Sequence, residues 1–241
     1  MTGDRPEAFD LCKIWVKNQT KKIDQWIVVD DGAKPMEEIP KDCHYVRRQP
    51  KPSDPKHTLV LNMKEALKHI EGDMIFILED DEYYAPKYIE KTSNALNDFE
   101  IIGIGRSKYY HLKGGYIRHM NLRHASLAQI GFKKSFIAQI EKVIEGNSFL
   151  DLRIWEALNG KDAYKCDAVN LLVKERITDD KKGIVVDDGE DALYLGIKGM
   201  IGRKGIGSGH IFGAHYIKDI RYEKLKQWLG KDFKYYQPYL G

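Results

Sequence analysis

The chain has 241 residues, of which 42% are hydrophobic and 31% charged, a composition that fits a soluble folded protein and argues against a disordered one. No apolar run approaches the length of a membrane span, and no basic-then-apolar leader is present. The net charge of +3 is far below the excess of a dedicated nucleic-acid-binding protein. Three widely spaced cysteines without a CxxC pair argue against a disulfide framework and a structural zinc site. We therefore expect a single cytoplasmic domain.

Short apolar strands alternate with amphipathic helical stretches over the first hundred residues. We expect strands at Gln25–Val29, Met74–Leu78 and Ile101–Gly105, and helices over Thr58–Ile70 and Pro86–Leu96 between them. Strands and helices at this spacing form right-handed crossovers. The predicted fold class is α/β, with a Rossmann-like, mostly parallel sheet flanked by helices and a smaller mixed region.

The start of the chain is unusual for such a fold, which normally opens with a strand. Only Met1 and Thr2 precede the turn-like segment Gly3–Pro6. The first strand is therefore either very short, or the chain begins inside it.

The pattern is less regular beyond residue 106. Helices are expected over Phe132–Ile144, Phe149–Leu158 and Tyr222–Leu229, and a short strand over Asp167–Val173. Residues 179–191 are acid-rich and predict an exposed loop, and residues 196–210 are rich in glycine.

Acidic residues follow two of the predicted strands, as Asp30-Asp31 and as the run Glu79–Glu82. In open α/β sheets, ligands bind beyond the carboxyl ends of the strands. Four consecutive acids repel one another, and a hard divalent cation such as Mg²⁺ or Mn²⁺ relieves that repulsion. Such a cation clamps a substrate diphosphate and stabilises a leaving phosphate. The alternative is a pair of solvated turns that carry incidental acids.

Four motifs occur in order within "TGDRPEAFDLCKIWVKNQ", "QWIVVDDG" and "GDMIFILEDDEYYAPKYI". They are Asp4-Arg5-Pro6 in place of the usual Asn-Arg-Pro, then Gln19, Asp30-Asp31-Gly32, and Glu79-Asp80-Asp81 in place of Asp-x-Asp. Together they resemble the nucleotide-sugar glycosyltransferases of the GT-A fold, especially the family-two-like members, over residues 1–105. The resemblance implies a single domain over residues 1–241. Its nucleotide-sugar-binding half would be residues 1–105, and its acceptor-side half, with a C-terminal Gly/Lys/His loop, residues 106–241.

The resemblance also implies roles for individual residues. Asp30 or Asp31 would accept a hydrogen bond from the nucleotide base or its ribose, and Asp81 would bind the metal. Glu79 would reach the ribose or the metal's water shell. The same motifs place further donor-binding residues at Asp4, Arg5 and Asp80. Two more side chains that could face the base or a phosphate are Arg47 and Arg48.

The catalytic base is less clear from the resemblance. Inverting members use a carboxylate to deprotonate the acceptor hydroxyl, commonly from a Glu-Asp pair that opens a helix, and here Ser148 and Phe149 stand in that place. Asp151 is then the nearest carboxylate and the first choice for the base. Asp191, in Gly189-Glu190-Asp191, is the competing choice. The alternative interpretation of Asp151 is structural, because the helix dipole stabilises an acidic residue at the start of a helix.

The glycine-rich segment has five glycines between residues 199 and 209. Its amide groups and cations suit a diphosphate cradle, although it matches no nucleotide-binding fingerprint. The cations assigned to donor binding are Lys198, Arg203 and Lys204. By resemblance, His210 completes the metal site, with His215 in reserve. The alternative is a flexible loop with a surface histidine.

Residues 108–123 carry four basic and three tyrosine side chains and no acid. They predict either an exposed polar loop or an acceptor surface. Openings like "TGDRP" with a glycine-rich tail are similar to sequences in phage genomes, some of which glycosylate hydroxymethylated pyrimidines in DNA. DNA with a flipped base is therefore one acceptor hypothesis, level with a glycan or a protein.

The function predicted from these features is transfer of a sugar from a nucleotide-diphospho sugar to a hydroxyl acceptor, with Mn²⁺ or Mg²⁺ as cofactor and with inversion. The setting would be the cytoplasm, or the host cytoplasm for a phage protein, without a membrane. One alternative is a sugar nucleotidyltransferase, although its usual GxGxR-type loop is absent from the sequence. The other is a non-catalytic module that binds a nucleotide sugar.

Overall fold

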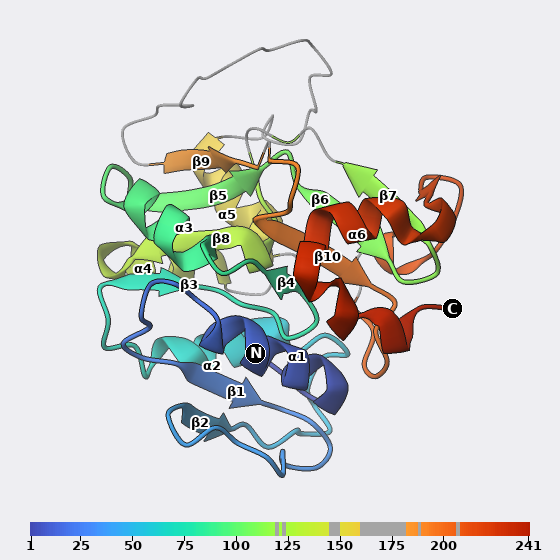
Figure 1. Cartoon of the computed structure of the whole chain (residues 1–241). Coiled ribbons are helices and arrows are strands. Elements are labelled where there is room, and N and C mark those ends of the chain that lie inside the picture. The colour runs from blue at the N-terminus through green and yellow to red at the C-terminus, as the bar shows by residue number, and fades with distance from the viewer. Residues whose placement is uncertain (119–120, 122–123, 145–149, 160–181, 188, 206–207) are drawn as a thin grey trace.

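The structure is a computed structural model that describes residues 1–118, 121, 124–144, 150–159, 182–187, 189–205 and 208–241 (Figure 1). Within these residues the strands form three groups of two, four and five strands. Short 3-10 turns occur at Leu127–Gln129, Lys134–Phe136, Ser208–His210, Ile220–Tyr222, Gly230–Tyr235 and Gln237–Tyr239. The predicted strand Asp167–Val173 lies outside the described residues.

The two-stranded group pairs β1 (Ile27–Asp30) with β2 (His44–Arg47) in parallel. Helix α1 (Pro6–Lys17) packs apolar side chains against β1, and Phe9, Cys12 and Val28 form a small buried cluster. The proline in the first turn suits this helix start, because its missing N–H has no partner within a helix at that position. Helix α2 (Leu59–Leu67) lies beside β1 in Figure 1, and both elements agree with the predicted ones to within a few residues.

The four-stranded sheet has the order β3-β8-β5-β9, with strands at Met74–Phe76, Ile130–Lys133, Ile101–Gly105 and Lys182–Val186. Three helices flank it, α3 (Tyr88–Leu96), α4 (Ile137–Ile144) and α5 (Leu150–Asn159). The apolar faces of α4 and α5 share a core that includes Phe132, Ile140 and Trp155, whereas Tyr88 and Ile89 of α3 belong to a separate apolar cluster.

This sheet corrects three predictions. It is mixed, because β8 lies between β3 and β5 and runs antiparallel to both. The helix predicted over Phe132–Ile144 starts only at Ile137, since a short apolar run fits a buried strand as well as a helix. Strand β9 occupies part of the predicted acidic loop at 179–191 and pairs in parallel with β5.

The five-stranded sheet has the order β11-β7-β6-β10-β4, with strands at Ile217–Lys218, Gly115–Arg118, Lys108–His111, Tyr194–Lys198 and Tyr83–Tyr84. Helix α6 (Glu223–Leu229) covers part of it in Figure 1 and confirms the predicted terminal helix. The polar loop predicted over residues 108–123 is instead, in its first part, the antiparallel hairpin β6–β7, whose turn contains Gly114 at φ +88°.

The hairpin buries residues that were predicted to be exposed. Lys108 is fully buried and forms an ion pair with Asp187, with 2.8 Å between Nζ and Oδ1. Tyr110 is equally buried and donates its hydroxyl to Asp219 at 3.0 Å. Alternate residues of a strand face the same side, which explains why these two turn inward together. Both side chains are therefore removed from the predicted acceptor surface.

The first strand of the sequence is reduced to a single bridge. Thr2 pairs in parallel with Asp30, and its N–H donates to the Val29 carbonyl at 2.9 Å. The turn that follows brings Asp4 to Ala33, beyond the carboxyl end of β1, and Arg5 to Asp80 and Asp81, beyond β3.

Candidate functional site

A cavity of about 370 Å³ lies where the carboxyl ends of β1 and β3 meet the segment that follows β10. Its volume falls within the usual range for small-molecule sites, about 300–1,000 Å³. The cavity is lined by seven of the predicted site residues, which come from the first half of the chain and from the glycine-rich segment. They are Arg5, Asp31, Glu79, Asp81, Lys198, Arg203 and Lys204. Two more predicted residues join them there, Asp151 and His210.

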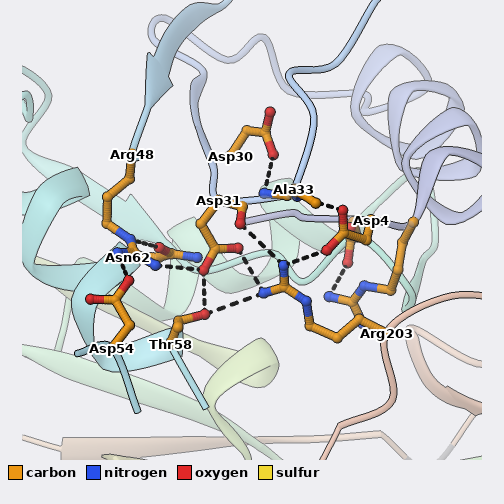
Figure 2. Close-up of polar contacts among 12 residues, drawn as sticks. Asp4, Asp30, Asp31, Ala33, Arg48, Asp54, Thr58, Asn62 and Arg203 are labelled. Carbon is orange, nitrogen blue, oxygen red and sulfur yellow. Dashed lines mark hydrogen bonds and ion pairs between the residues drawn. The ribbon is translucent and has the colours of Figure 1, made fainter. Parts of the chain in front are cut away.

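Asp31 lies at the centre of a polar network on one wall of this cavity (Figure 2). One carboxylate oxygen accepts hydrogen bonds from Arg48, at 2.7 Å, and from the Thr58 hydroxyl. The other accepts from Arg203 at 2.8 Å. Burial alone would raise the pKa of Asp31, but the Thr58 and Arg48 hydrogen bonds, the charge of Arg203 and a contact with Asn62 together lower this pKa below its ordinary value. Asp31 is therefore a fixed carboxylate at the cavity wall.

Arg203 ties the glycine-rich segment to the start of the chain. In addition to Asp31, it donates to the Asp4 carboxylate at 2.8 Å, and Asp4 in turn accepts from the Ala33 N–H at 2.7 Å (Figure 2). A Cβ at Gly3 would collide with the Asp31 carboxylate and with the Arg203 guanidinium, so any other residue there would displace this ion pair. Asp4 thus holds Arg203 in place and is not among the cavity-lining residues.

Asp30 has a different environment from its neighbour. Its carboxylate is fully buried and accepts from the N–H groups of Gly32 and Met36 and from the Tyr45 hydroxyl, at 2.8, 3.1 and 2.7 Å. It does not line the cavity. Asp30 and Asp31 were the two candidates for contact with the nucleotide. Asp31 lines the cavity, whereas Asp30 is buried and does not.

The acidic run after β3 surrounds Arg5. The guanidinium of Arg5 lies 2.5 Å from Asp80 and 2.6 Å from Asp81, and both carboxylates are buried. Burial raises the pKa of Asp80 to about 6, even though Arg5 opposes the shift. Burial and the negative charge of Asp81 raise the pKa of Glu79 to about 8. The run is thus an acidic cluster that is only partly neutralised by its cationic neighbours.

Three of these carboxylates suit a divalent cation. Glu79, Asp81 and Glu82 each offer an oxygen, and these oxygens lie within 4.8 Å of one another. Oδ1 of Asp81 is buried without a hydrogen-bond partner. Glu82 accepts from the Ile197 N–H at 2.6 Å and from Lys198 at 2.5 Å, which occupies both of its oxygens. The unpartnered oxygen and the hard donor set therefore fit Mg²⁺ or Mn²⁺, with Asp81 and Glu79 as the available ligands.

Cationic groups face this acidic cluster from the glycine-rich segment. Lys198 is held by Glu82 and lies over the Tyr109 ring, 5.6 Å from its centroid. Burial, with a smaller contribution from Lys198, lowers the pKa of His210 to about 4. A neutral imidazole is the form that binds metal. Lys204 also lines the cavity and is exposed.

The two candidates for the catalytic base lie in different places. Asp151, in the first turn of α5, lines the cavity, and burial raises its pKa. Asp191 is exposed and is not among the lining residues, and its backbone carbonyl accepts from Lys108 at 3.1 Å. Of these two candidates, Asp151 is therefore the one whose side chain can contact a ligand in this cavity.

Several cavity residues were not predicted as site residues from the sequence. Thr58 and Asn62 lie at the start of α2 and contact Asp31 and Arg48. Neither belongs to a motif, and the only local signal is that a helix begins near the predicted carboxyl edge of the sheet. Lys56 and His57, directly before Thr58, also line the cavity, and further lining side chains come from distant elements, namely Tyr109, Ser126 and Tyr216.

The comparison with known proteins decides the family. The model of the family described as glycosyl transferase family 2 matches residues 14–150, more than half of the chain. The chain belongs to this family. The match includes the acidic ends of β1 and β3, which line the cavity.

The solved structures that resemble the chain share its GT-A-like α/β fold. The crystal structure of S. aureus TarS 1-349 superposes with a TM-score of 0.54 at 10% identity, covering 81% of this chain and 58% of that one. The crystal structure of TarS 1-349 in complex with UDP-GlcNAc gives a TM-score of 0.51 at 10% identity, with coverages of 88% and 60%. The chain thus spans less than two thirds of the structures that it matches. No protein with a curated description matches the sequence.

None of the helices in the described part of the chain is long and apolar enough to cross a membrane.

Proposed function

We propose that this protein transfers a sugar from a nucleotide-diphospho sugar to an acceptor hydroxyl, and that the 370 Å³ cavity is its donor site. One observation carries the proposal. In a chain of glycosyl transferase family 2, the acidic ends of β1 and β3 and the cationic glycine-rich segment line a single cavity. Carboxylates for a cation and basic groups for a diphosphate are the complementary charges that such a donor requires.

The donor would lie with its nucleoside against Asp31 and its diphosphate against the cations. Asp31 lines the cavity from the end of β1, and a carboxylate accepts hydrogen bonds from base or ribose donors. Lys198, Arg203 and Lys204 would face the phosphates. A divalent cation would be held by Asp81 and Glu79, with His210 as a third ligand. When bound, it supplies charge stabilisation to the departing diphosphate.

Asp151 is the proposed base. Its carboxylate would take the proton of the acceptor hydroxyl while the hydroxyl oxygen bonds to the anomeric carbon. The bond from that carbon to the phosphate oxygen breaks, and the nucleoside diphosphate leaves with the electron pair. Attack from the face opposite the leaving group inverts the anomeric carbon, as the family resemblance implies. Burial raises the pKa of Asp151, which makes it a stronger base than an exposed aspartate.

The first donor to test is a uridine-diphospho sugar. The TarS structure that resembles this chain was solved with UDP-GlcNAc, which makes that compound a reasonable starting probe.

The acceptor stays open between a glycan or protein and hydroxymethylated pyrimidines of phage DNA. Burial of Lys108 and Tyr110 removes part of the basic, aromatic surface on which the DNA hypothesis depends. A DNA acceptor predicts activity that falls steeply between about 50 and 200 mM salt. Activity that stays constant over this range favours a glycan or a protein.

The experiment is release of nucleoside diphosphate from a panel of nucleotide sugars, with Mn²⁺, Mg²⁺ or chelator, for the unaltered chain and two variants. Asp81→Asn removes a proposed metal ligand. Asp10→Asn is the matched control, because Asp10 is exposed on α1, with 62% of its side chain accessible. We expect metal-dependent release that is lost only in Asp81→Asn. Nucleotide binding without release in any combination would instead favour the non-catalytic binding module.

A further inference from the structure

Two histidine rings meet at the surface, where the start of β2 lies close to the end of α2. His44 is the first residue of β2, and His69 follows the last residue of α2 by two positions. Nε2 of His44 lies 3.2 Å from Nδ1 of His69, and the ring centroids are 4.7 Å apart. His44 is exposed and His69 is partly exposed, so solvent reaches the pair. Neither ring lines the donor cavity.

The spacing of the two facing nitrogens suits a metal ion held between them. Zinc binds imidazole nitrogen at about 2.0–2.1 Å in tetrahedral geometry, which places two such nitrogens about 3.3–3.4 Å apart. The separation here is 3.2 Å. Two neutral imidazoles at this distance share one proton in a hydrogen bond, in which one ring donates and the other accepts. A metal ion would replace that proton and accept a lone pair from each ring.

The far side of the His69 ring faces a carboxylate. Oε1 of Glu65, one helical turn earlier, lies 3.5 Å from Nε2 of His69. A histidine that binds a metal through one ring nitrogen usually donates the N–H of the other to a carboxylate, a carbonyl or water. A proton on Nε2 leaves the lone pair on Nδ1, the nitrogen that faces His44. The Oε2 atom of Glu65 pairs with Lys68 at 2.6 Å, which leaves Oε1 for the histidine.

The backbone on which each ring is carried is fixed by hydrogen bonds. The N–H of His44 donates to the Trp26 carbonyl at 2.7 Å, beside the paired strands β1 and β2. The His69 carbonyl accepts from the side-chain amide of Gln25 at 2.7 Å, and the same side chain accepts from the Glu71 N–H at 3.0 Å. Gln25 therefore ties the end of α2 to the residues before β1. Ligands that are already held in place lose little freedom when an ion binds, which favours binding.

We propose that His44 and His69 form a binding site for a divalent transition-metal ion such as Zn²⁺, Ni²⁺ or Cu²⁺, with Glu65 as the outer partner of His69 and water at the remaining positions. Imidazole suits these metals, whereas the carboxylates of Glu79 and Asp81 suit Mg²⁺ and Mn²⁺. The two sites thus favour different ions. The inference does not depend on the proposed reaction.

An ion at this site would link β2 to α2. The segment between the two histidines carries Arg48, Thr58 and Asn62, whose side chains form the network around Asp31. An ion that binds only the folded chain stabilises it by mass action. Fixing both ends of this segment would therefore help to hold the wall of the donor cavity that carries Asp31.

The first test is a titration of Zn²⁺ into the chain with ¹⁵N-labelled histidine. We expect the Nε2 resonance of His44 and the Nδ1 resonance of His69 to shift together and to saturate at one equivalent of this site. Asp81→Asn, which removes a ligand of the donor-site cation, should leave these shifts unchanged. Their absence in the unaltered chain, or their loss in Asp81→Asn, would overturn the proposal.

The second test is calorimetry of Zn²⁺ binding in the Asp81→Asn background. His44→Gln and His69→Gln each remove one ligand and should weaken binding by roughly 100-fold or more, because even the outer partners of a ligating histidine contribute about 10–100-fold. Glu65→Gln removes the outer partner and should weaken binding by about tenfold. Lys68→Gln is the matched control, since 65% of the Lys68 side chain is exposed and it offers no ligand.

Melting curves verify that each variant is folded before its affinity is compared. We expect Lys68→Gln to bind Zn²⁺ as tightly as its parent. Equal affinities in His69→Gln and Lys68→Gln would overturn the proposal, because the ion would then be held elsewhere. The resonance shifts of the two rings in the unaltered chain decide the question even if a histidine variant fails to fold.

Discussion

Arg203 and Asp31 lie 172 positions apart in the sequence, and 2.8 Å separates the Arg203 Nη1 from the Asp31 Oδ1 (Figure 2). This ion pair brings the glycine-rich segment over the end of β1 and so closes one wall of the donor cavity. Arg203 reaches Asp4 with its other terminal nitrogen, which gives the contact a fixed orientation.

Arg203→Ala should weaken donor binding more than it weakens the fold. The side chain is 36% exposed, so its ion pairs contribute little to stability, whereas its loss frees the segment from the cavity wall. We expect the KM for the donor to rise about tenfold, which corresponds to about 1.4 kcal/mol. Steady-state kinetics and a melting curve measure the two effects. Arg203→Lys keeps the positive charge but lacks the planar guanidinium, so its KM for the donor should lie between those of the unaltered chain and Arg203→Ala. An unchanged KM in Arg203→Ala would contradict this role.

Asp30→Ala should destabilise the protein, because one buried donor and two partly buried donors lose their acceptor at once. The expected loss in the free energy of unfolding is about 2–3 kcal/mol, measured by urea denaturation. Asp10→Ala, on the exposed face of α1, should change it by less than about 0.5 kcal/mol. Equal free energies of unfolding for the two variants would show that the Asp30 hydrogen bonds contribute little to stability.

Asp151→Asn and Asp191→Asn separate the two candidates for the base. Loss of a general base lowers kcat by about 10²–10⁴-fold, and we expect this for Asp151→Asn. Its KM for the donor should change little, because the amide keeps the shape of the carboxyl. Asp191→Asn should retain activity, since Asp191 lies outside the described cavity lining. The opposite result would transfer the role to Asp191.

The Asp31 network also predicts a pH dependence of stability. Hydrogen bonds from Thr58 and Arg48 lower the pKa of Asp31 in the folded protein below its unfolded value, despite the opposing effect of burial. A lowered folded pKa stabilises the protein above the unfolded pKa, near 3.9, and this contribution is lost as the pH falls through the folded value.

Arg48→Ala removes one of these partners and should move the acid unfolding midpoint to higher pH. A series of melting curves from about pH 6 to pH 3 measures the shift. Lys91→Ala, which removes an exposed positive charge from α3, controls for net charge. Identical acid midpoints for the two variants would contradict the role of the network.

The local sequence pattern was sufficient to predict the strands that precede the acidic residues and the helices that follow them. Strand β5 has the predicted bounds, and β1, β3, α2 and α3 agree with the expected segments to within three residues at each end, because their apolar periodicity is strong and turn residues bound them. The GT-A-like fold was also predictable, since its motifs occur in order within residues 1–105.

The pairing of the strands was not predictable in the same way. Strand β3 pairs with β8, a four-residue strand that comes more than fifty positions later in the sequence. A short apolar run like β8 has no periodicity that distinguishes a strand from a helix, so this pairing could not be predicted. The inward side chain of Lys108 is a similar case, because its buried partner Asp187 comes from a distant segment. The different roles of Asp30 and Asp31 likewise depend on Tyr45 and Arg203, which no local motif connects with β1.

The most direct test of the donor site is a thermal-shift screen of nucleoside diphosphates and nucleotide sugars, each with and without Mn²⁺, on the unaltered chain and on Asp81→Asn. A ligand that binds only the folded state stabilises it by about 2.7 kcal/mol at a hundredfold excess over its Kd, and so raises the melting temperature. We expect one nucleotide to raise the melting temperature of the unaltered chain only when Mn²⁺ is present, and Mn²⁺ to add nothing in Asp81→Asn. No shift with any nucleotide, from well-folded protein, would contradict the assignment of this cavity as a donor site.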